Sequence, residues 1–391
     1  MLPTLYSRDR CGLCGECLAS CPVMKIDQAD AARFVERLAA GEYVFEVLDR
    51  CTGCMSCISF CPNGAHPYGL LLERYVERYR ELGIPQIFCN AMPLRQGPNL
   101  WRGLDRWLTD KEREDLAAWS KAPVSEEVLF LGCNQRLTPY IADSRIFDGI
   151  KIFTDAGECC GEYYLRLGLV DEARRRAASL AGRFRELGVQ RVIAFCPACE
   201  NTMTNLAPNA LGVDYGVEVI GLVEWLSAGV TDGSIDLKRR LSGTVTVQDP
   251  CHASGLGAGP VEEVRRLLKL MGLDLREMDG CGDAALCCGL GASLARYKLR
   301  DVIRTGVLRA RDAGSTGADL TCAWCNGCYM VMNMFRLLYP WTPPVYHLLE
   351  LLELATGEKP VRKMPARGFQ LVVAGLESVA RDGFSFARTR I

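Results

Sequence analysis

Residues 11–22 read CGLCGECLASCP and residues 51–62 read CTGCMSCISFCP, so one run of four cysteines and a proline occurs twice. Three cysteines on a tight turn can reach three corners of a cubane 4Fe-4S cluster, and in two-cluster proteins the fourth cysteine of each run binds the other cluster. The spacing therefore predicts two cubane clusters with crossed ligands, the alternatives being zinc knuckles or a disulfide framework. One set is Cys11, Cys14, Cys17 and Cys61, and the other is Cys51, Cys54, Cys57 and Cys21.

A helix is expected in the 29 residues that separate the two runs (22–50). Its apolar residues recur at helical spacing, and Asp27 or Asp30 can cap its start. An amphipathic stretch over 70–82 follows the second run. We therefore expect residues 1–88 to form a helical two-cluster ferredoxin domain rather than a β-rich one. The apolar positions of the first helix are Ala31, Phe34, Val35 and Leu38.

Composition favours a globular protein that binds metal groups over a nucleic-acid binder. The chain has 391 residues, of which 49% are hydrophobic and 24% charged, and its net charge of −1 lacks a basic excess. Its 21 cysteines stand beside only three histidines, so ligand sets explain them better than disulfides or zinc alone. The sequence starts without an apolar signal-peptide core and contains no run of about 18 apolar residues. A cytoplasmic protein is expected, either free or held at a membrane through a partner.

The pattern changes twice beyond residue 88. Residues 89–124 contain three tryptophans and scattered prolines, and we expect them to connect two domains. From residue 125 onward, short apolar stretches alternate with longer helical ones, which is typical of an α/β fold with a mostly parallel sheet. The expected strands are 128–131, 151–153, 192–195, 217–220, 245–247 and 318–321.

A cysteine pattern repeats within this α/β region. A lone cysteine, a Cys-Cys-Gly triplet and a CxxC pair occur twice in that order. The triplet and the pair are separated by 34 residues (162–195) in the first repeat and by 32 (290–321) in the second. The first repeat has Cys133, Cys159-Cys160-Gly161 and Cys196-Pro-Ala-Cys199, and the second has Cys251, Cys287-Cys288-Gly289 and Cys322-Ala-Trp-Cys325.

Two pseudo-symmetric α/β repeats are therefore expected, over residues 125–240 and 241–358. The lone cysteines and the pairs follow expected strands, so they should lie at the carboxyl edges of the sheets, where open α/β sheets build ligand sites. The last stretch, 359–391, is locally basic and is expected to be a C-terminal tail, solvated or docked to a partner.

The twofold pattern, preceded by two cubane runs, resembles the heterodisulfide reductase family, specifically proteins that fuse its B-type catalytic subunit to its C-type ferredoxin subunit. The resemblance covers about residues 8–355. It implies that each five-cysteine set holds a non-cubane 4Fe-4S cluster and that both clusters face a substrate disulfide, which they split reductively. The implied ligands are Cys133, Cys159, Cys160, Cys196 and Cys199 in one repeat, and Cys251, Cys287, Cys288, Cys322 and Cys325 in the other.

Two features depart from a simple repeat. Cys325 with Cys328 offers an alternative CxxC, but alignment with the first repeat favours Cys322 with Cys325. Between the lone cysteine and the triplet there are 25 residues (134–158) in the first repeat and 35 (252–286) in the second, so the first site is expected to be narrower. One of the two sites is alternatively a zinc or structural site.

Three cysteines and one histidine outside these sets also need an assignment. Cys89 is expected to be a buried core thiol, whereas Cys281 is either a spare ligand or a redox-active thiol, and Cys328 has no assigned role. His252 follows Cys251 and is the one candidate for a catalytic role, through a hydrogen bond to a cluster sulfur or a proton for a departing thiolate. The alternative for His252 is a turn-stabilising role.

The pattern predicts a subunit that passes electrons from cubane to cubane and then to the repeat sites, where a disulfide is reduced or formed. No flavin or nicotinamide motif is visible, so the electrons must be exchanged with a partner: a flavoprotein, a hydrogenase or dehydrogenase subunit, or a membrane cytochrome. The substrate is expected to be a thiol or disulfide, as a small molecule or a protein, and no nucleic acid is expected. One alternative is a relay between a dehydrogenase or flavoprotein and a quinone or other carrier, and another is a zinc-stabilised scaffold in which only the cubanes are active.

Overall fold

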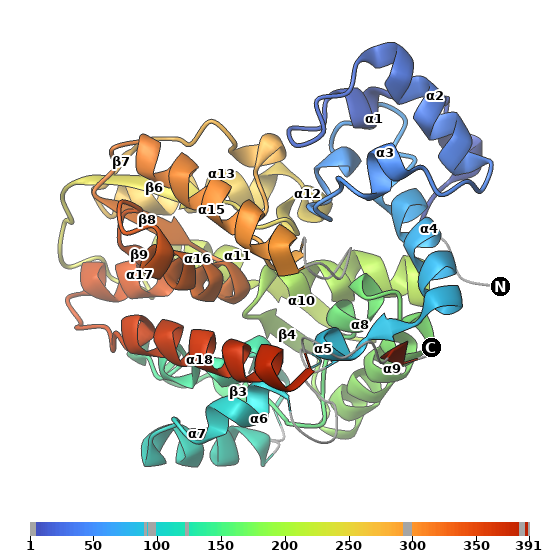
Figure 1. Cartoon of the computed structure of the whole chain (residues 1–391). Helices are drawn as coiled ribbons and strands as arrows, with labels where there is room; N and C mark the ends of the chain where they lie inside the picture. The colour runs from blue at the N-terminus through green and yellow to red at the C-terminus, as the bar shows by residue number, and fades with distance from the viewer. Residues whose placement is uncertain are drawn as a thin grey trace.

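The computed structural model describes residues 5–89, 92, 99–121, 125–291, 299–382 and 388–389. These residues form a helical N-terminal region and two four-stranded parallel sheets covered by helices. Figure 1 shows the N-terminal region, in blue, at one end of the molecule, next to α8 of the first sheet's half and α12 of the second. Within the described part of the chain, no helix combines the length and the apolar character needed to cross a bilayer.

Short helices build the N-terminal region, as the sequence predicts. In the helix between the two runs, the Asp27 side chain accepts a hydrogen bond from the Asp30 backbone N at 3.0 Å, and the four predicted apolar positions are buried. The helix after the second run starts at Pro67, where His66 Nδ1 caps it by accepting from Gly69 N at 3.2 Å. The elements are α1 (Glu16–Ala19), α2 (Gln28–Ala39), α3 (Phe45–Leu48) and α4 (Pro67–Leu82), with 3-10 turns at Arg8–Arg10 and Ser56–Ile58.

The first sheet has the strand order β3-β2-β4-β5, and all its strands are parallel. The chain thus leaves β2 toward β3 on one side and returns to β4 on the other, which makes the β2–β4 boundary the topological switch point. Its strands are β2 (Glu127–Phe130), β3 (Lys151–Phe153), β4 (Arg191–Ala194) and β5 (Glu218–Gly221). Its helices are α8 (Glu162–Arg166), α9 (Val170–Glu186), α10 (Pro197–Asn201), a π-helix (Thr202–Leu211) and α11 (Leu222–Asp232), with 3-10 turns at Asn134–Leu137, Pro139–Ile141 and Arg145–Phe147.

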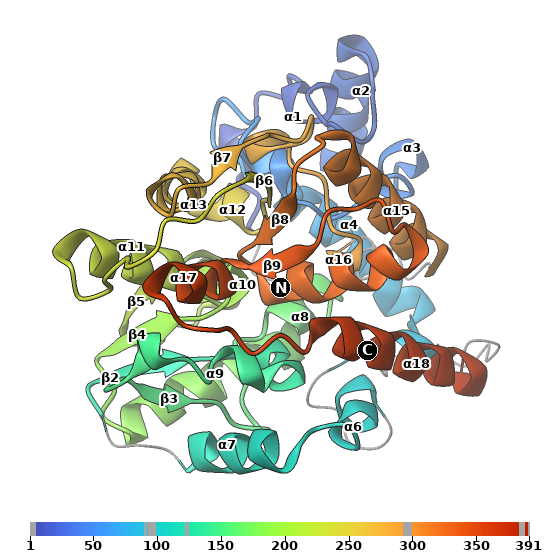
Figure 2. The same cartoon turned by 90° about the vertical axis from the view of Figure 1, so that its left-hand side faces the viewer.

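The second sheet has the corresponding order, β7-β6-β8-β9, and is also parallel throughout. In Figure 2 this sheet lies between the blue N-terminal region and the green first sheet. Its strands are β6 (Thr244–Gln248), β7 (Asp274–Leu275), β8 (Leu320–Ala323) and β9 (Val345–His347). Its helices are α12 (Ala253–Leu256), α13 (Ala258–Leu270), α15 (Leu299–Ser315), α16 (Asn326–Leu338) and α17 (Leu348–Thr356), with a 3-10 turn at Gly282–Ala284.

The expected α/β architecture is confirmed, and five of the six expected strands lie within one residue of the observed ones at each end. The exception matters for the site. The strand expected at 318–321 is β8, which runs from Leu320 to Ala323. Its carboxyl end therefore lies two residues further along the chain, which moves Cys322 into the strand.

Most of the described part of the expected C-terminal tail is a packed helix rather than a solvated segment. It forms α18 (Met364–Asp382), which packs against α16 and buries Met364, Leu371 and Ala374. Arg367, one of the residues that make this stretch basic, is buried and donates to Glu112 of the connector at 2.8 Å. Apolar residues recur at helical spacing along this stretch, and they form the buried face of the helix. The remaining elements are β1 (Ile84–Pro85), α5 (Gln86–Cys89), α6 (Leu100–Asp105), α7 (Asp110–Ser120) and β10 (Arg388–Thr389), which pairs with β1.

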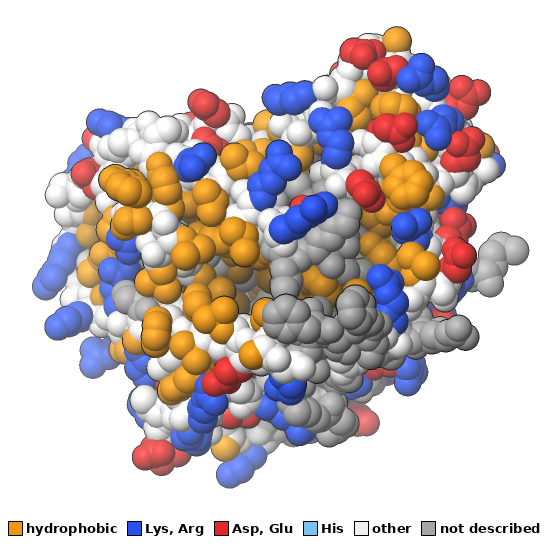
Figure 3. Space-filling model, in the orientation of Figure 1, with side chains coloured by type: hydrophobic (Ala, Val, Ile, Leu, Met, Phe, Trp, Pro, Cys, Tyr) orange, Lys and Arg blue, Asp and Glu red, His pale blue; other side chains and the backbone are white. Residues whose placement is uncertain are grey.

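Parts of the expected connector, residues 90–91, 93–98 and 122–124, lie outside the described residues. One face of the molecule carries exposed apolar side chains on α15, α16 and α18, among them Leu308, Leu338 and Phe369. Figure 3 shows these orange side chains gathered over the three helices. The buried core, in contrast, is continuous from the N-terminal helices through both sheets.

Candidate functional site

Four cysteines from both runs line one small cavity in the N-terminal region. Cys11, Cys14 and Cys17 belong to the first run, and Cys61 belongs to the second. Burial, together with the neighbouring thiols of Cys61, Cys11 and Cys14, raises the pKa of Cys17 to about 12. Four sulfur donors around an apolar cavity fit a cubane 4Fe-4S cluster, which takes up the charge of the thiolates. The apolar lining includes Leu18, Val35, Leu38, Leu70 and Leu71.

A left-handed glycine lets the first run curl beneath α2. Gly15 has φ +79°, and a Cβ there would lie 2.3 Å from the backbone N of Ala32. Only glycine avoids this clash, and it adopts positive φ without strain. The close approach of the turn to α2 brings Cys14 and Cys17, on either side of Gly15, to the same cavity.

The second run forms a neighbouring group with Cys21. Burial, followed by the Cys54 thiol, raises the pKa of Cys51 to about 12, and Cys21 also contributes. Burial raises the pKa of Cys57 strongly, and the first thiol to add to it is Cys17 of the other group. The structure thus brings each run together with the fourth cysteine of the other, and it sets the two groups side by side.

The first repeat gathers its five predicted cysteines at the carboxyl edge of its sheet. Cys133 follows β2 and Cys196 follows β4, so both lie at the switch point, where open parallel sheets bind ligands. Cys159 Sγ lies 4.0 Å from Cys133 Sγ. Cys160 adjoins Cys159 and Cys199, whose thiol groups raise and lower its pKa, respectively. The smaller gap in the sequence therefore does not exclude Cys133 from the group.

Gly132 makes room for this group. It has φ +68°, and a Cβ at this position would lie 2.8 Å from Cys199 Sγ. A side chain here would therefore push Cys199 out of place, in addition to straining the backbone.

The second repeat also gathers five cysteines, but one differs from the predicted set. Cys287 and Cys288 adjoin each other, and Cys328 lies against both Cys288 and Cys325. Cys251, after β6, contributes to raising the pKa of Cys287. The five thiols in this group are Cys251, Cys287, Cys288, Cys325 and Cys328.

The prediction that Cys322 is a ligand is corrected. Cys322 is fully buried within β8, between Val247 of β6 and Tyr346 of β9. Burial raises the pKa of its thiol, and the charges that act most on it are Asp249, Arg265 and Glu350 rather than cysteines. Cys322 is thus a buried strand residue, away from the thiols gathered beyond the carboxyl end of β8, where the alignment had placed it.

The structure instead matches Cys325-Asn-Gly-Cys328 with Cys196-Pro-Ala-Cys199. Cys196 is the N-cap of α10 and Cys325 is the N-cap of α16, each after the strand in the same sheet position. The gap from Gly289 to Cys325 then holds 35 residues (290–324), against 34 in the first repeat. Cys328, left without a role by the sequence, belongs to the group.

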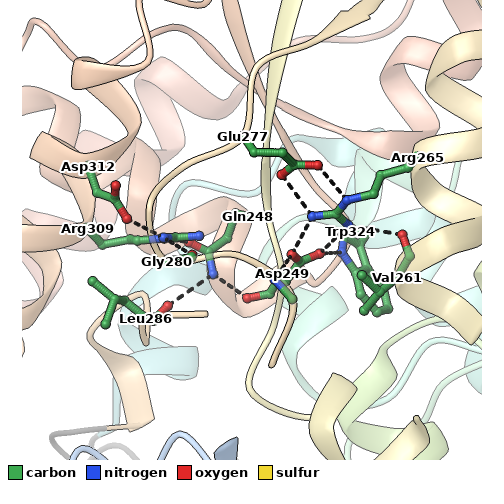
Figure 4. A network of polar contacts seen from close by, with 11 residues as sticks. Gln248, Asp249, Val261, Arg265, Glu277, Gly280, Leu286, Arg309, Asp312 and Trp324 are labelled. Carbon is green, nitrogen blue, oxygen red and sulfur yellow. Dashed lines mark hydrogen bonds and ion pairs between the residues drawn. The ribbon is translucent and has the colours of Figure 1, made fainter. Parts of the chain in front are cut away.

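A buried polar network holds the chain on both sides of the second group (Figure 4). Arg265 donates to both carboxylate oxygens of Asp249, at 3.1 and 2.8 Å, and Trp324 Nε1 donates to the same carboxylate. Gln248 donates to the carbonyl of Leu286 at 3.5 Å and accepts from Arg309 at 2.6 Å. Asp249 precedes Cys251 by two residues and Leu286 directly precedes Cys287, so the network fixes both cysteines. No pattern in the sequence predicts a role for these residues.

Three polar residues meet beside Cys251, and only His252 was foreseen. Both terminal nitrogens of Arg166 lie 3.5 Å from Cys251 Sγ, and Nη2 lies 2.7 Å from His252 Nε2. Glu162 accepts from Arg166 Nε at 2.7 Å and lies 3.0 Å from His252 Nε2. Burial would raise the pKa of Glu162, but Arg166 and His252 outweigh it and lower that pKa to about 2. His252 Nδ1 also lies 3.1 Å from Asn201, so the imidazole is held on both sides.

An open cleft leads to the second group from outside. It has a volume of about 670 Å³ and lies between the N-terminal region and α15. Cys287 lines it, and so do three exposed arginines, Arg50, Arg300 and Arg304. Two aspartates, Asp49 and Asp301, also line it, so the described lining carries a small positive excess.

The remaining predictions concern single residues and single ions. Cys89 is buried in α5, as expected, and Cys281 is partly exposed near Glu277 and Arg265. Among the described residues, no three His, Cys, Asp or Glu side chains converge at the spacing of one bound metal ion. Support for iron-sulfur groups therefore comes from the all-cysteine donor sets and their surroundings.

Two family models match the chain. A 4Fe-4S dicluster domain matches residues 7–65, which include both cysteine runs. The CCG cysteine-rich domain matches residues 147–204 and 245–333, one stretch in each repeat.

Curated relatives are iron-sulfur subunits of oxidoreductases. The D subunit of the dihydromethanophenazine:CoB--CoM heterodisulfide reductase of Methanosarcina barkeri is 29% identical over 63% of this chain, which spans only 64% of that relative's length. The B subunit of the fumarate reductase (CoM/CoB) of Methanothermobacter marburgensis is 25% identical over 89% of this chain and 72% of its own. The glycolate oxidase iron-sulfur subunit of Escherichia coli is 26% identical over 78% of this chain and 85% of its own.

Proposed function

The chain is an iron-sulfur protein similar to the D subunit of heterodisulfide reductases, with a 4Fe-4S dicluster domain followed by CCG cysteine-rich domains, and we propose from this premise that it is a catalytic electron-transfer subunit. It exchanges electrons with a partner at the dicluster domain. At the two CCG sites, which hold non-cubane 4Fe-4S clusters, it reduces or forms a disulfide.

One observation carries this proposal: the two five-thiol groups meet. Cys196 Sγ of the first lies 4.0 Å from Cys325 Sγ of the second, and both are buried. Two electrons are needed to split one disulfide, and a joint site can hold both sulfur atoms of the substrate. A structural zinc site needs only four ligands, and its function does not require a second site beside it.

The proposed ligands follow the grouping of the thiols. The same strand order in both sheets supports two homologous, pseudo-symmetric repeats, in which Cys328 replaces Cys322. The cubane ligands are Cys11, Cys14, Cys17 and Cys61 for one cluster and Cys51, Cys54, Cys57 and Cys21 for the other. The repeat ligands are Cys133, Cys159, Cys160, Cys196 and Cys199, and Cys251, Cys287, Cys288, Cys325 and Cys328.

The exposure of the cysteines in the two cubane groups suggests the order in which electrons pass through them. Cys14 of the first-run group is exposed, which supports this group as the contact with the partner. The second-run group lies deeper and adjoins the second repeat: a Cβ at Gly291 would lie 3.3 Å from Cys287 Sγ and 3.4 Å from the Thr52 carbonyl O. We therefore propose the order first-run cubane, second-run cubane, second-repeat site.

The chemistry balances as two electrons and two protons for each disulfide, which yields two thiols, or the reverse. When bound, the clusters supply one-electron transfer and iron sites for sulfur. The cleft at Cys287 is wide enough for a small disulfide, and its three arginines favour one that carries carboxylate or other anionic groups. The partner is proposed to be a flavoprotein, a hydrogenase or dehydrogenase subunit, or a membrane cytochrome.

Anaerobic iron and sulfide analysis with EPR tests the proposal. We expect about 16 iron atoms per chain, against about eight if only the cubanes form. A paramagnetic signal should appear when the oxidised protein receives a thiol that is a half of its substrate. Absence of any thiol-dependent signal across a panel of anionic thiols, in protein with about 16 iron atoms, would overturn disulfide chemistry.

That result would favour the second candidate, a relay between a dehydrogenase or flavoprotein and a quinone or other carrier. The likeness to the glycolate oxidase iron-sulfur subunit supports this candidate, since that relative is named as the iron-sulfur subunit of an oxidase. Rapid reoxidation of the reduced protein by a soluble quinone, with no reoxidation by disulfides, is the outcome expected of a relay.

A further inference from the structure

Arg166 lies at the junction of three parts of the chain. It belongs to α8 of the first repeat, yet its guanidinium faces Cys251 of the second repeat and donates to the Gly53 carbonyl at 3.4 Å. Gly53 lies between Cys51 and Cys54 of the second run. Only 6% of Arg166 is exposed, and a Cβ at Gly291 would lie 2.5 Å from its Nη1, so its side chain is enclosed.

Every direction of this guanidinium is used. Nε donates to Glu162, Nη1 donates to Gly53 and Cys251, and Nη2 faces Cys251 and His252. A guanidinium keeps its charge at all physiological pH values and presents its donors in a fixed fork. Burying such a charge is costly unless it is paired, and Glu162 supplies one anion. The Cys251 sulfur, once a thiolate, supplies the second.

We propose that Arg166 is a positioning residue that fixes the Cys51–Cys54 loop against the second-repeat site and stabilises negative charge on the Cys251 sulfur. This inference rests on the proposed function, because it takes Cys251 as a cluster ligand. Hydrogen bonds to ligand sulfur and nearby charge set the potential of an iron-sulfur cluster. A fixed cation at Cys251 favours the state with one more electron, so it raises the reduction potential of the second-repeat site.

The neighbouring anion, Glu162, should change the reduction potential in the opposite direction. Glu162 lies 2.7 Å from Arg166 Nε and offsets its charge. Glu162→Gln keeps the size of the side chain and removes the anion, so it should move the potential upward. A merely structural role for the Arg166 and Glu162 pair predicts no such opposition of sign.

The experiment is an EPR-monitored redox titration of the full-length protein with its clusters, for the wild type and four variants. Arg166→Gln should lower the ratio of reduced to oxidised second-repeat cluster about tenfold at fixed potential, a shift of about 59 mV to more negative values for a one-electron couple. Arg166→Lys, which keeps the charge, should shift less. Glu162→Gln should shift to more positive values. Arg175→Gln on α9, which removes a cation that is 75% exposed, is the matched control and should not shift.

Iron content separates the possible failures. Variants with wild-type iron and an unchanged second-repeat potential would overturn the role of Arg166 and leave the proposed function intact. If the wild type itself holds only about eight iron atoms, the second-repeat cluster does not exist and both proposals fall. If Arg166→Gln loses iron, Glu162→Gln decides: a positive shift supports the proposal, and no shift overturns it.

Discussion

Cys196 Sγ and Cys325 Sγ lie 4.0 Å apart although they are 129 positions apart in the chain. Each caps the helix that follows the third strand of its half, β4 or β8, so the two sheets meet through equivalent corners. Parallel sheets concentrate their ligand sites at carboxyl edges. Joining two such edges brings ten cysteines into one continuous region, which is more than either half can assemble alone.

The corrected ligand set predicts different fates for two cysteines of the second repeat. Cys328→Ser should lower the iron content by up to about four atoms per chain, because it removes a thiol of the group. Cys322→Ala should keep the full iron content, since Cys322 lies within β8. Iron analysis of both variants checks this, and the reverse result would restore the alignment of Cys322 with Cys196.

Crossed ligation predicts that Cys61→Ala disturbs the cluster of the other run. The EPR signal lost should be the one that Cys11→Ala also removes, because both thiols line the same cavity. The signal removed by Cys51→Ala should remain. Cys89→Ala, which also deletes a buried thiol but lies outside both groups, should keep both signals. Coincidence of the Cys61 and Cys51 phenotypes would contradict the crossing.

Two glycines with positive φ separate backbone strain from displacement of a ligand. Gly132→Ala and Gly149→Ala each place an alanine at positive φ, which costs about 1 kcal/mol. Only at Gly132 does the new Cβ meet Cys199 Sγ, whereas nothing lies within 4 Å at Gly149. Both variants should lose stability through backbone strain, Gly132→Ala the more because of its contact with Cys199, but only Gly132→Ala should lose iron from the first repeat. Equal iron loss in both would show that strain alone is responsible.

The arginines of the cleft predict a charge preference. Arg304→Glu should raise the KM for a dianionic aryl disulfide by about tenfold, a change of about 1.4 kcal/mol, and should affect a neutral dipyridyl disulfide little. Raising the salt concentration should reduce the difference, because the side chain is exposed. Arg311→Glu, on the same helix outside the cleft, is the control. A uniform effect on both disulfides would mean that the cleft does not recognise charge.

Glu353 predicts a loss of stability as the pH rises. Burial, opposed by the Ser144 hydroxyl and reinforced by Glu350, raises the pKa of Glu353 from 4.5 to about 7. A carboxyl that binds its proton more tightly when folded contributes fully below its unfolded pKa, and that contribution is lost as the pH rises through about 7.

Glu353→Gln should therefore unfold at a higher temperature than the wild type at pH 8, with a smaller difference at pH 6. The expected change between the two pH values is about 1 kcal/mol. Anaerobic thermal unfolding followed by circular dichroism measures it, with the exposed Glu186→Gln as control. A difference that is the same at both pH values would assign the effect to packing rather than ionisation.

Local chemistry explains what the sequence predicts well. The CxxCxxCxxxCP runs, the helix capped by Asp27 and five of the strands all depend on residues close together in the chain. The prediction for Cys322 is wrong for the same reason: an apolar pattern places a strand only to within a few residues, and a shift of two residues put Cys322 inside β8 rather than after it. A spacing of 32 or 35 residues could not decide between the pairs.

Contacts between residues far apart in the chain cannot be predicted from local sequence patterns. Arg166 and Cys251 are 85 residues apart, and nothing in the sequence of either half signals that one reaches the other. The sequence signal for this contact is the pair Glu162 and Arg166, which stand four residues apart directly after the first Cys-Cys-Gly triplet. The sequence does not predict α18, because basic residues stand among the apolar positions with which it packs.

The reach of Arg166 from the first half to Cys251 has a consequence for how this chain can change over evolution. The halves are not independent modules, since Arg166 of the first half completes the surroundings of Cys251 in the second. A chimera that takes residues 125–240 from a relative must bring a compatible pair at positions 162 and 166. Substitutions at these positions and around Cys251 should consequently occur together, as they do at the interface of an obligate dimer.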